Sequence, residues 1–73
     1  MQTESFGQRI RYLRTKKGMT QKELAKALYV SESTVSGWER GRAEPSIDFI
    51  IKLTASLQTS LNYLIIGNKK KTP

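Results

Sequence analysis

The stretch from Ser31 to Arg40 holds the side chains best suited to chemistry with a partner. Its hydroxyl groups lie at Ser31, Ser33, Thr34 and Ser36. A hydroxyl becomes a nucleophile only beside a general base. The sequence contains no His and no Cys, and no paired acids that would line a plausible pocket. We therefore expect no enzyme activity, and hydrogen bonding is the chemistry left to these side chains.

The charge of the chain points to an acidic partner. Thirteen Lys and Arg residues against six Asp and Glu residues give the 73-residue chain a net charge of +7. Such an excess favours association with an acidic polymer or surface. Without Cys or His, neither a disulfide nor an ordinary zinc site can form, so we expect no metal and no cofactor. No apolar run approaches the roughly 18 residues of a membrane span, so we expect no membrane contact and a cytoplasmic protein.

Hydrophobic periodicity predicts five helices and no strand. The expected helices are Glu4–Lys17, Gln21–Leu28, Glu32–Arg40, Ile47–Leu57 and Ser60–Gly67. The periodicity turns Ile47 and Leu61 inward and leaves Arg9 mostly off the apolar face. We expect residues 1–67 to form one domain, and residues 68–73 to be a basic disordered tail or the start of a linker.

The second and third predicted helices begin with strong capping signals. Thr20 and Glu23 have the spacing of a capping box, in which each side chain accepts from the other residue's backbone N–H. Ser31 is the expected N-cap of the third helix. On that helix Val35 and Trp38 point inward and the polar residues point outward. Two short helices joined by residues 29–31, the second with a polar outer side, are typical of a helix-turn-helix.

The same residues resemble a known family. TQKELA at 20–25 and VSESTVSGWERG at 30–41, followed by EPS at 44–46, are similar to the phage-repressor and Cro-type helix-turn-helix regulators, also called XRE-like. The resemblance runs from Phe6 to Gly67. It implies an all-α, lambda-repressor-like five-helix bundle. It also implies a sequence-specific transcriptional regulator of the repressor type that binds double-stranded DNA through Glu32–Arg40.

The resemblance also assigns roles to individual residues. The side chains implied to face bases are Glu32, Ser33, Ser36 and Gly37. Those implied to lie near phosphates are Gln21, Lys22, Arg40 and Arg42, and Gln21 would also brace the recognition helix. Arg14 and Glu39 are implied to form an internal ion pair.

Two residues of the expected base-reading side have alternative explanations. Glu32 could accept a hydrogen bond from a cytosine amine, or it could simply interact with the helix dipole at the N-terminus. Gly37 costs a helix interior up to about 1 kcal/mol relative to Ala. Close approach of the backbone to DNA explains that cost, and so does neutral drift.

The sequence departs from the family at the turn. The residue after Leu28 is usually Gly, but here it is Tyr29, and a left-handed conformation costs an ordinary residue about 1–2 kcal/mol. Either the turn has another geometry or packing of Tyr29 offsets the strain. Residues 58–59 are Gln-Thr where Gly-Val is common, which would weaken the core near the last helix.

Family members generally bind near-palindromic operators as homodimers, with recognition helices about 34 Å apart. The apolar residues expected off the inner faces, and so available for a dimer interface or for completing the core, are Phe49, Tyr63, Ile65 and Ile66. Other functions remain open at this point. An antitoxin or restriction-modification controller would use the same DNA mechanism, some family domains bind proteins, and the charge alone would suit RNA or an anionic membrane.

Overall fold

The protein is described from a computed structural model that covers residues 5–67. Its five helices are α1 (Phe6–Lys16), α2 (Gln21–Leu28), α3 (Glu32–Arg40), α4 (Ile47–Leu57) and α5 (Leu61–Ile66). Residues 5–67 contain no strand, so the predicted all-α, five-helix fold is confirmed. The bounds of α2, α3 and α4 are those predicted. The predicted starts of the first and last helices are wrong, because α1 begins at Phe6 after the N-cap Ser5 and α5 begins at Leu61 after the N-cap Ser60. The predicted tail at 68–73 lies outside the described residues.

All five helices begin with a hydroxyl side chain as N-cap. The caps are Ser5, Thr20, Ser31, Ser46 and Ser60, and each accepts a hydrogen bond from the backbone N–H three residues later. Such a bond satisfies one of the N–H groups that a helix leaves unpaired at its start. The Thr20–Glu23 capping box is present as predicted, and a second one, unpredicted, joins Ser5 to Gln8.

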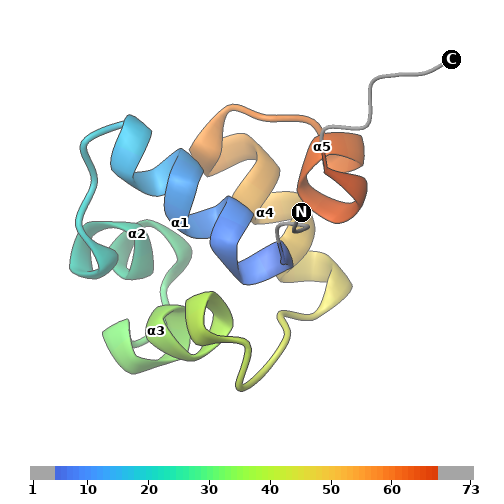
Figure 1. The fold of residues 1–73 in the computed structure, drawn as a ribbon. Helices are drawn as coiled ribbons and strands as arrows, with labels where there is room; N and C mark the ends of the chain where they lie inside the picture. The colour runs from blue at the N-terminus through green and yellow to red at the C-terminus, as the bar shows by residue number, and fades with distance from the viewer. Residues whose placement is uncertain (1–4, 68–73) are drawn as a thin grey trace, which may run out of the picture.

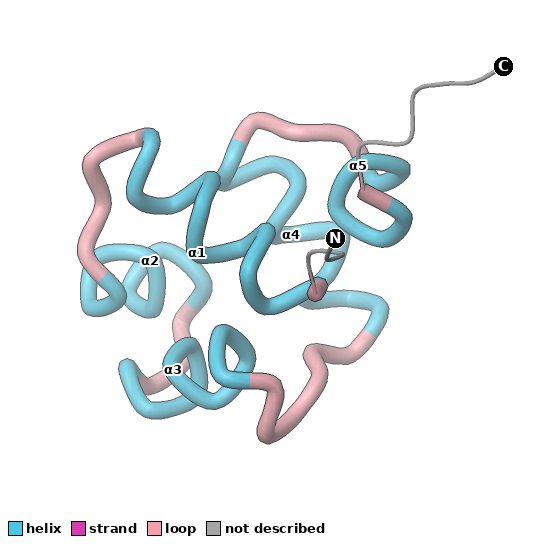
Figure 2. Tube along the Cα trace, viewed as in Figure 1, coloured by secondary structure: helices cyan, strands magenta, loops and turns pink. Residues whose placement is uncertain are grey.

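The helices surround one hydrophobic core. Its buried residues are Ile10, Leu24, Ala25, Leu28, Val35, Trp38, Leu53, Leu57 and Leu64. Helix α1 contacts α3 and α5, while α4 contacts α2 and α5. Figures 1 and 2 show α2 and α3 together on one side of α1, with α5 on the other side. The helix-turn-helix thus occupies one end of the domain.

Two predicted inward residues face solvent instead. Ile47 is 63% exposed and Leu61 is 48% exposed. Each is the first residue of its helix, directly after the N-cap. These side chains therefore lie at the end of the helix rather than along the part that packs against the core. The periodicity does not show where that part begins.

The prediction that Arg9 lies off the buried side of α1 is wrong. Arg9 is only 5% exposed. Its guanidinium donates from Nε to the carbonyl oxygen of Leu64, at 2.9 Å, and from Nη2 to that of Ile65, at 2.8 Å. The reason is tertiary, because the C-terminal carbonyls of α5 supply acceptors that allow a cation to be buried.

Phe49 packs against the core, which is one of the two alternatives that the sequence left open for it. Its ring centroid is 5.7 Å from that of Trp38. Tyr63 is half-buried, whereas Ile65 and Ile66 are exposed. The expected set of free apolar side chains is therefore reduced to the two isoleucines of α5.

The turn between α2 and α3 has the left-handed geometry that glycine favours. Tyr29 has φ 61° and ψ 41°, and Gln58 at the end of α4 is also left-handed, with φ 54°. Tyr29 is 92% exposed. The turn therefore does not have another geometry, and packing of Tyr29 does not offset its strain. Neither of the two predicted explanations applies.

Candidate nucleic-acid interface

Helix α3 has one side fixed in the core and one side in solvent. Val35, Trp38 and Glu39 are buried, with at most 8% exposure. The residues that resemblance assigned to bases lie on the remaining surface: Glu32 and Ser33 are exposed, and Ser36 and Gly37 are partly exposed. The helix therefore presents a polar side to a partner without giving up its contacts with the core.

The hydroxyl groups near the start of α3 divide into two kinds. Ser31 accepts from the backbone N–H of Thr34 at 3.1 Å, and the two hydroxyl oxygens lie 2.8 Å apart. These two hydroxyls are used inside the helix cap. Within residues 5–67, no side-chain hydrogen bond is recorded for Ser33 or Ser36, so their hydroxyls remain able to donate to or accept from a partner.

A buried ion pair joins α1 to the inner side of α3. Arg14 donates from Nε to Oε2 of Glu39 at 2.7 Å and from Nη2 to Oε1 at 3.0 Å. This two-bond arrangement is the strong, geometrically specific form of an arginine–carboxylate pair. Hydrogen bonding to Glu39 raises the pKa of Arg14, although burial acts in the opposite direction. Arg14 also donates to the carbonyl oxygen of Met19 at 2.8 Å.

Gln21 extends this network into α2. Its Nε2 donates to Oε1 of Glu39 at 3.0 Å, which is the bracing contact that the resemblance implied. Helices α1, α2 and α3 are thereby tied through one carboxylate, with Arg14 in the last turn of α1, Gln21 at the start of α2 and Glu39 near the end of α3. A single buried acid thus sets the angle at which the polar side of α3 is presented.

Gly7 is a further determinant of this geometry that sequence reasoning missed. A Cβ atom at Gly7 would lie 2.4 Å from the carbonyl oxygen of Trp38 and 2.6 Å from that of Glu39. Both atoms are backbone, so no side chain can move aside. The only signal in the sequence was a glycine inside a predicted helix, where glycine is unfavourable.

The residues assigned to phosphates lie near the ends of α2 and α3. Lys22, Arg40 and Arg42 are exposed, and Gln21 is partly exposed. Lys22 belongs to the first turn of α2, where free backbone N–H groups and the helix dipole favour an anion. Arg40 ends α3, and Arg42 follows in the loop, where its backbone N–H donates to the carbonyl oxygen of Gly37 at 2.9 Å. Arg40 and Arg42 thus lie at the C-terminal end of α3, and Lys22 at the start of α2.

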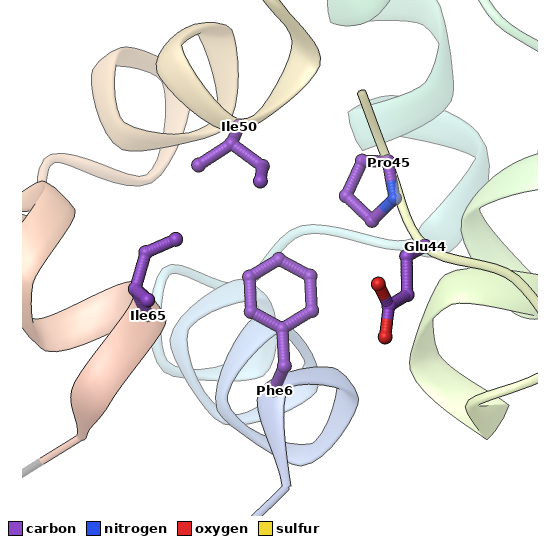
Figure 3. Close-up of a pocket in the computed structure, with 5 residues that line it drawn as sticks. All are labelled: Phe6, Glu44, Pro45, Ile50 and Ile65. Carbon is purple, nitrogen blue, oxygen red and sulfur yellow. The ribbon is translucent and has the colours of Figure 1, made fainter. Parts of the chain in front are cut away.

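An apolar area lies elsewhere on the surface. Leu61, Ile65 and Ile66 of α5 are 44–55% exposed. Ile65 also lines a pocket of about 200 Å³ with Phe6, Pro45, Ile50 and the carboxylate-bearing Glu44. Figure 3 shows the side chains of Ile50 and Ile65 directed toward the ring of Phe6. Leu61 is an exposed apolar residue that the sequence analysis had placed in the core.

The described residues offer no other site of recognisable chemistry. Residues 5–67 contain no group of three or more His, Cys, Asp or Glu side chains placed to hold a metal ion. Among the same residues, no helix is both long enough and apolar enough to cross a lipid bilayer.

Comparison with known proteins yields consistent similarities. A helix-turn-helix family model matches residues 10–64. The chain is 42% identical over 69 residues to the HTH-type transcriptional regulator DicA of Escherichia coli K12, covering 94% of this chain and 51% of DicA. It is 38% identical over 72 residues to repressor protein C2 of Salmonella phage P22, covering 99% of this chain and 33% of C2. The chain thus spans about half or less of the length of these relatives.

A solved structure is similar as well. The P22 c2 repressor in complex with a synthetic operator superposes with a TM-score of 0.86 at 38% identity, covering 90% of this chain and all of that one. The similarity therefore extends over nearly the whole set of helices and not only over the two in the middle of the chain.

Proposed function

Because this chain belongs to the helix-turn-helix family, we propose that it binds double-stranded DNA in a sequence-specific way and represses transcription. Helix α3 would enter the major groove, which is about 12 Å wide and accepts one helix. The single observation behind this proposal is the division of α3 into a locked inner side, at Val35, Trp38 and Glu39, and an open polar side. The protein would be bacterial or phage-encoded and act in the cytoplasm.

The relatives support this assignment by their own activities. DicA is a transcriptional regulator, C2 is a repressor, and the P22 c2 repressor was solved with operator DNA. The net charge of +7 adds a sequence-independent attraction to the phosphate backbone that weakens as salt rises.

We assign the contacts by chemistry. Ser33 and Ser36 would donate to or accept from base edges, and Glu32 would accept from a cytosine amine. The contacts to phosphates would come from Lys22, Arg40, Arg42 and the free amides at the start of α2, with Gln21 adding one through its second amide hydrogen. Phosphate contacts hold the register, and base contacts supply the sequence preference.

We further propose that the chain binds a near-palindromic operator as a homodimer. A symmetric dimer buries the same patch on both copies. Ile65 and Ile66, joined by Leu61, form the exposed apolar patch that suits such an interface. Phe49 and Tyr63, part of the interface predicted from sequence, would contribute less because both are partly buried in the monomer.

A binding-site selection from a random DNA pool tests the proposal. The selected duplex and a scrambled one are then titrated at two salt concentrations. We expect a clear preference for the selected duplex at both concentrations. Steep salt dependence with no preference would reduce the function to charge attraction, and no binding at low salt would favour a protein partner instead.

Two substitutions refine the same experiment. Ser33→Ala should change which sequence is selected, because a base contact is lost, whereas Arg42→Ala should weaken binding to all duplexes alike and lower the salt slope by about one. The reverse pattern would show that the contacts are assigned to the wrong residues.

A further inference from the structure

Gly37 differs from the other glycines of the chain. Gly18, Gly41 and Gly67 have φ values of 75°, 79° and 94°, a region that favours glycine. Gly7 is required because a Cβ would collide with the backbone of α3. Gly37 has neither requirement: its φ is not positive, and a Cβ built there would meet nothing within 4 Å.

The fold would therefore be more stable with alanine at this position. Glycine is the least favourable residue in a helix interior apart from proline, because it loses the most backbone freedom. Residues 32–40 form α3, and Gly37 lies in its second half, where its carbonyl oxygen accepts from the backbone N–H groups of Gly41 and Arg42. No contact among the described residues explains why a glycine stands here.

The position of Gly37 indicates where the outside contact would be. Residues four apart lie on one face of a helix, which places Gly37 beside Ser33. Both belong to the solvent side of α3, with Val35 and Trp38 buried on the other side. Without a Cβ, the surface over the Cα of Gly37 is open, because nothing lies within 4 Å of the place where a Cβ would be.

We infer that Gly37 determines specificity by receiving the 5-methyl group of a thymine. The inference rests on the proposed function and names the base that α3 would recognise at one position. Among the unmodified bases, only thymine carries a methyl group into the major groove. A hydrogen-bonding base edge would gain nothing from a bare Cα, whereas a methyl group gains van der Waals contact with it.

Uracil substitution tests this directly, because uracil keeps every hydrogen-bonding group of thymine and lacks only the methyl. In the duplex selected by the wild-type chain, each thymine is replaced by uracil in turn, and the dissociation constants are measured. We expect wild type to lose about fourfold in affinity at one position per half-site, the effect of one buried methyl group.

The Gly37→Ala variant should remove that sensitivity. Its added methyl would take the place proposed for the thymine methyl, so the variant should bind the thymine duplex about tenfold or more weakly than wild type. It should no longer prefer thymine over uracil at that position. Its melting temperature should rise by about 4–8 °C, which proves that the weaker binding does not come from a damaged fold.

Thr15→Ala provides the matched control. Thr15 is an exposed residue of α1, and alanine there also improves helix propensity. This variant should melt at a higher temperature than wild type and keep both its affinity and its response to uracil. Stabilisation by itself would then be excluded as the cause of the lower DNA affinity of Gly37→Ala.

The outcomes separate the inference from the proposed function. If Gly37→Ala binds the selected duplex like wild type and shows the same uracil response, the thymine contact is wrong while the DNA-binding function stands. If its melting temperature falls, the premise that the fold does not need this glycine is wrong. If the wild-type chain selects no sequence, the proposed function fails, and the thymine contact fails with it.

Discussion

Helices α3 and α5 are both attached to α1 by a buried arginine, but the two arginines bind different partners. Arg14 binds the side-chain carboxylate of Glu39 in α3, with a shortest distance of 2.7 Å. Arg9 binds the backbone carbonyl oxygens of Leu64 and Ile65 at the end of α5. The first attachment joins two full charges, and the second joins one charge to the partial negative charge at a helix C-terminus.

The difference fits the proposed tasks of the two helices. Helix α3 is held by Arg14, by Gln21 through the same carboxylate, and by the close approach of Gly7. A helix that reads bases must be held within about 0.5 Å of its productive position, so several independent contacts are an advantage. Helix α5 has only six residues and exposes apolar side chains, which suits a surface that is completed by a second copy.

The largest expected effect comes from breaking the attachment of α3. Glu39→Ala leaves the guanidinium of Arg14 buried without its carboxylate, and we expect the free energy of unfolding to fall by about 3–5 kcal/mol. Urea denaturation measures this value. Replacing both residues by methionine should restore most of the loss, since an apolar pair leaves no unpaired charge. A loss below about 1 kcal/mol in Glu39→Ala would contradict the structural importance of the pair.

Gly7→Ala should have the next largest effect. The added methyl group meets two backbone carbonyl oxygens, so α1 and α3 must separate. We expect the free energy of unfolding to fall by about 2–3 kcal/mol. Thermal unfolding measures it, with Gly37→Ala as the matched glycine control that should change stability in the opposite direction. Equal melting temperatures for Gly7→Ala and wild type would show that α1 shifts without penalty.

Arg9→Met tests the attachment of α5. It should lower the free energy of unfolding by about 2 kcal/mol, less than the changes above, because the lost hydrogen bonds go to neutral acceptors. Hydrogen exchange should show reduced amide protection in α5 and unchanged protection in α3. Arg11→Met, at an exposed position of the same helix, should leave both helices unaffected. Equal loss of protection in α3 and α5 would mean that the two attachments are not independent.

The smallest effect is expected at the turn, which neither arginine reaches. Tyr29→Gly should raise the free energy of unfolding by about 1 kcal/mol, because glycine adopts the left-handed conformation without strain. Ala27→Gly, two residues earlier and inside α2, should lower it by about the same amount. A destabilised Tyr29→Gly would reveal packing of the tyrosine ring that its 92% exposure argues against.

Much of the fold was predictable because its signals are local. The Thr20–Glu23 capping box and the cap at Ser31 marked the starts of α2 and α3, since a capping side chain bonds a backbone group only three residues away. The apolar spacing of Val35 and Trp38 identified the inner side of α3. For the proposed site, the resemblance led to the Arg14–Glu39 pair, of which only Glu39 lies within a quoted motif, at 30–41.

The sequence by itself therefore determined where α2, α3 and α4 begin and most of the apolar stripe of each helix, because those properties depend on neighbours within a few residues. Only the tertiary structure decided that Arg9 is buried and that Gly7 touches the backbone of α3. It also decided that Ile47 and Leu61 remain in solvent. In the first two cases the partners are backbone carbonyl oxygens from distant helices, which every residue type possesses and no sequence pattern can identify.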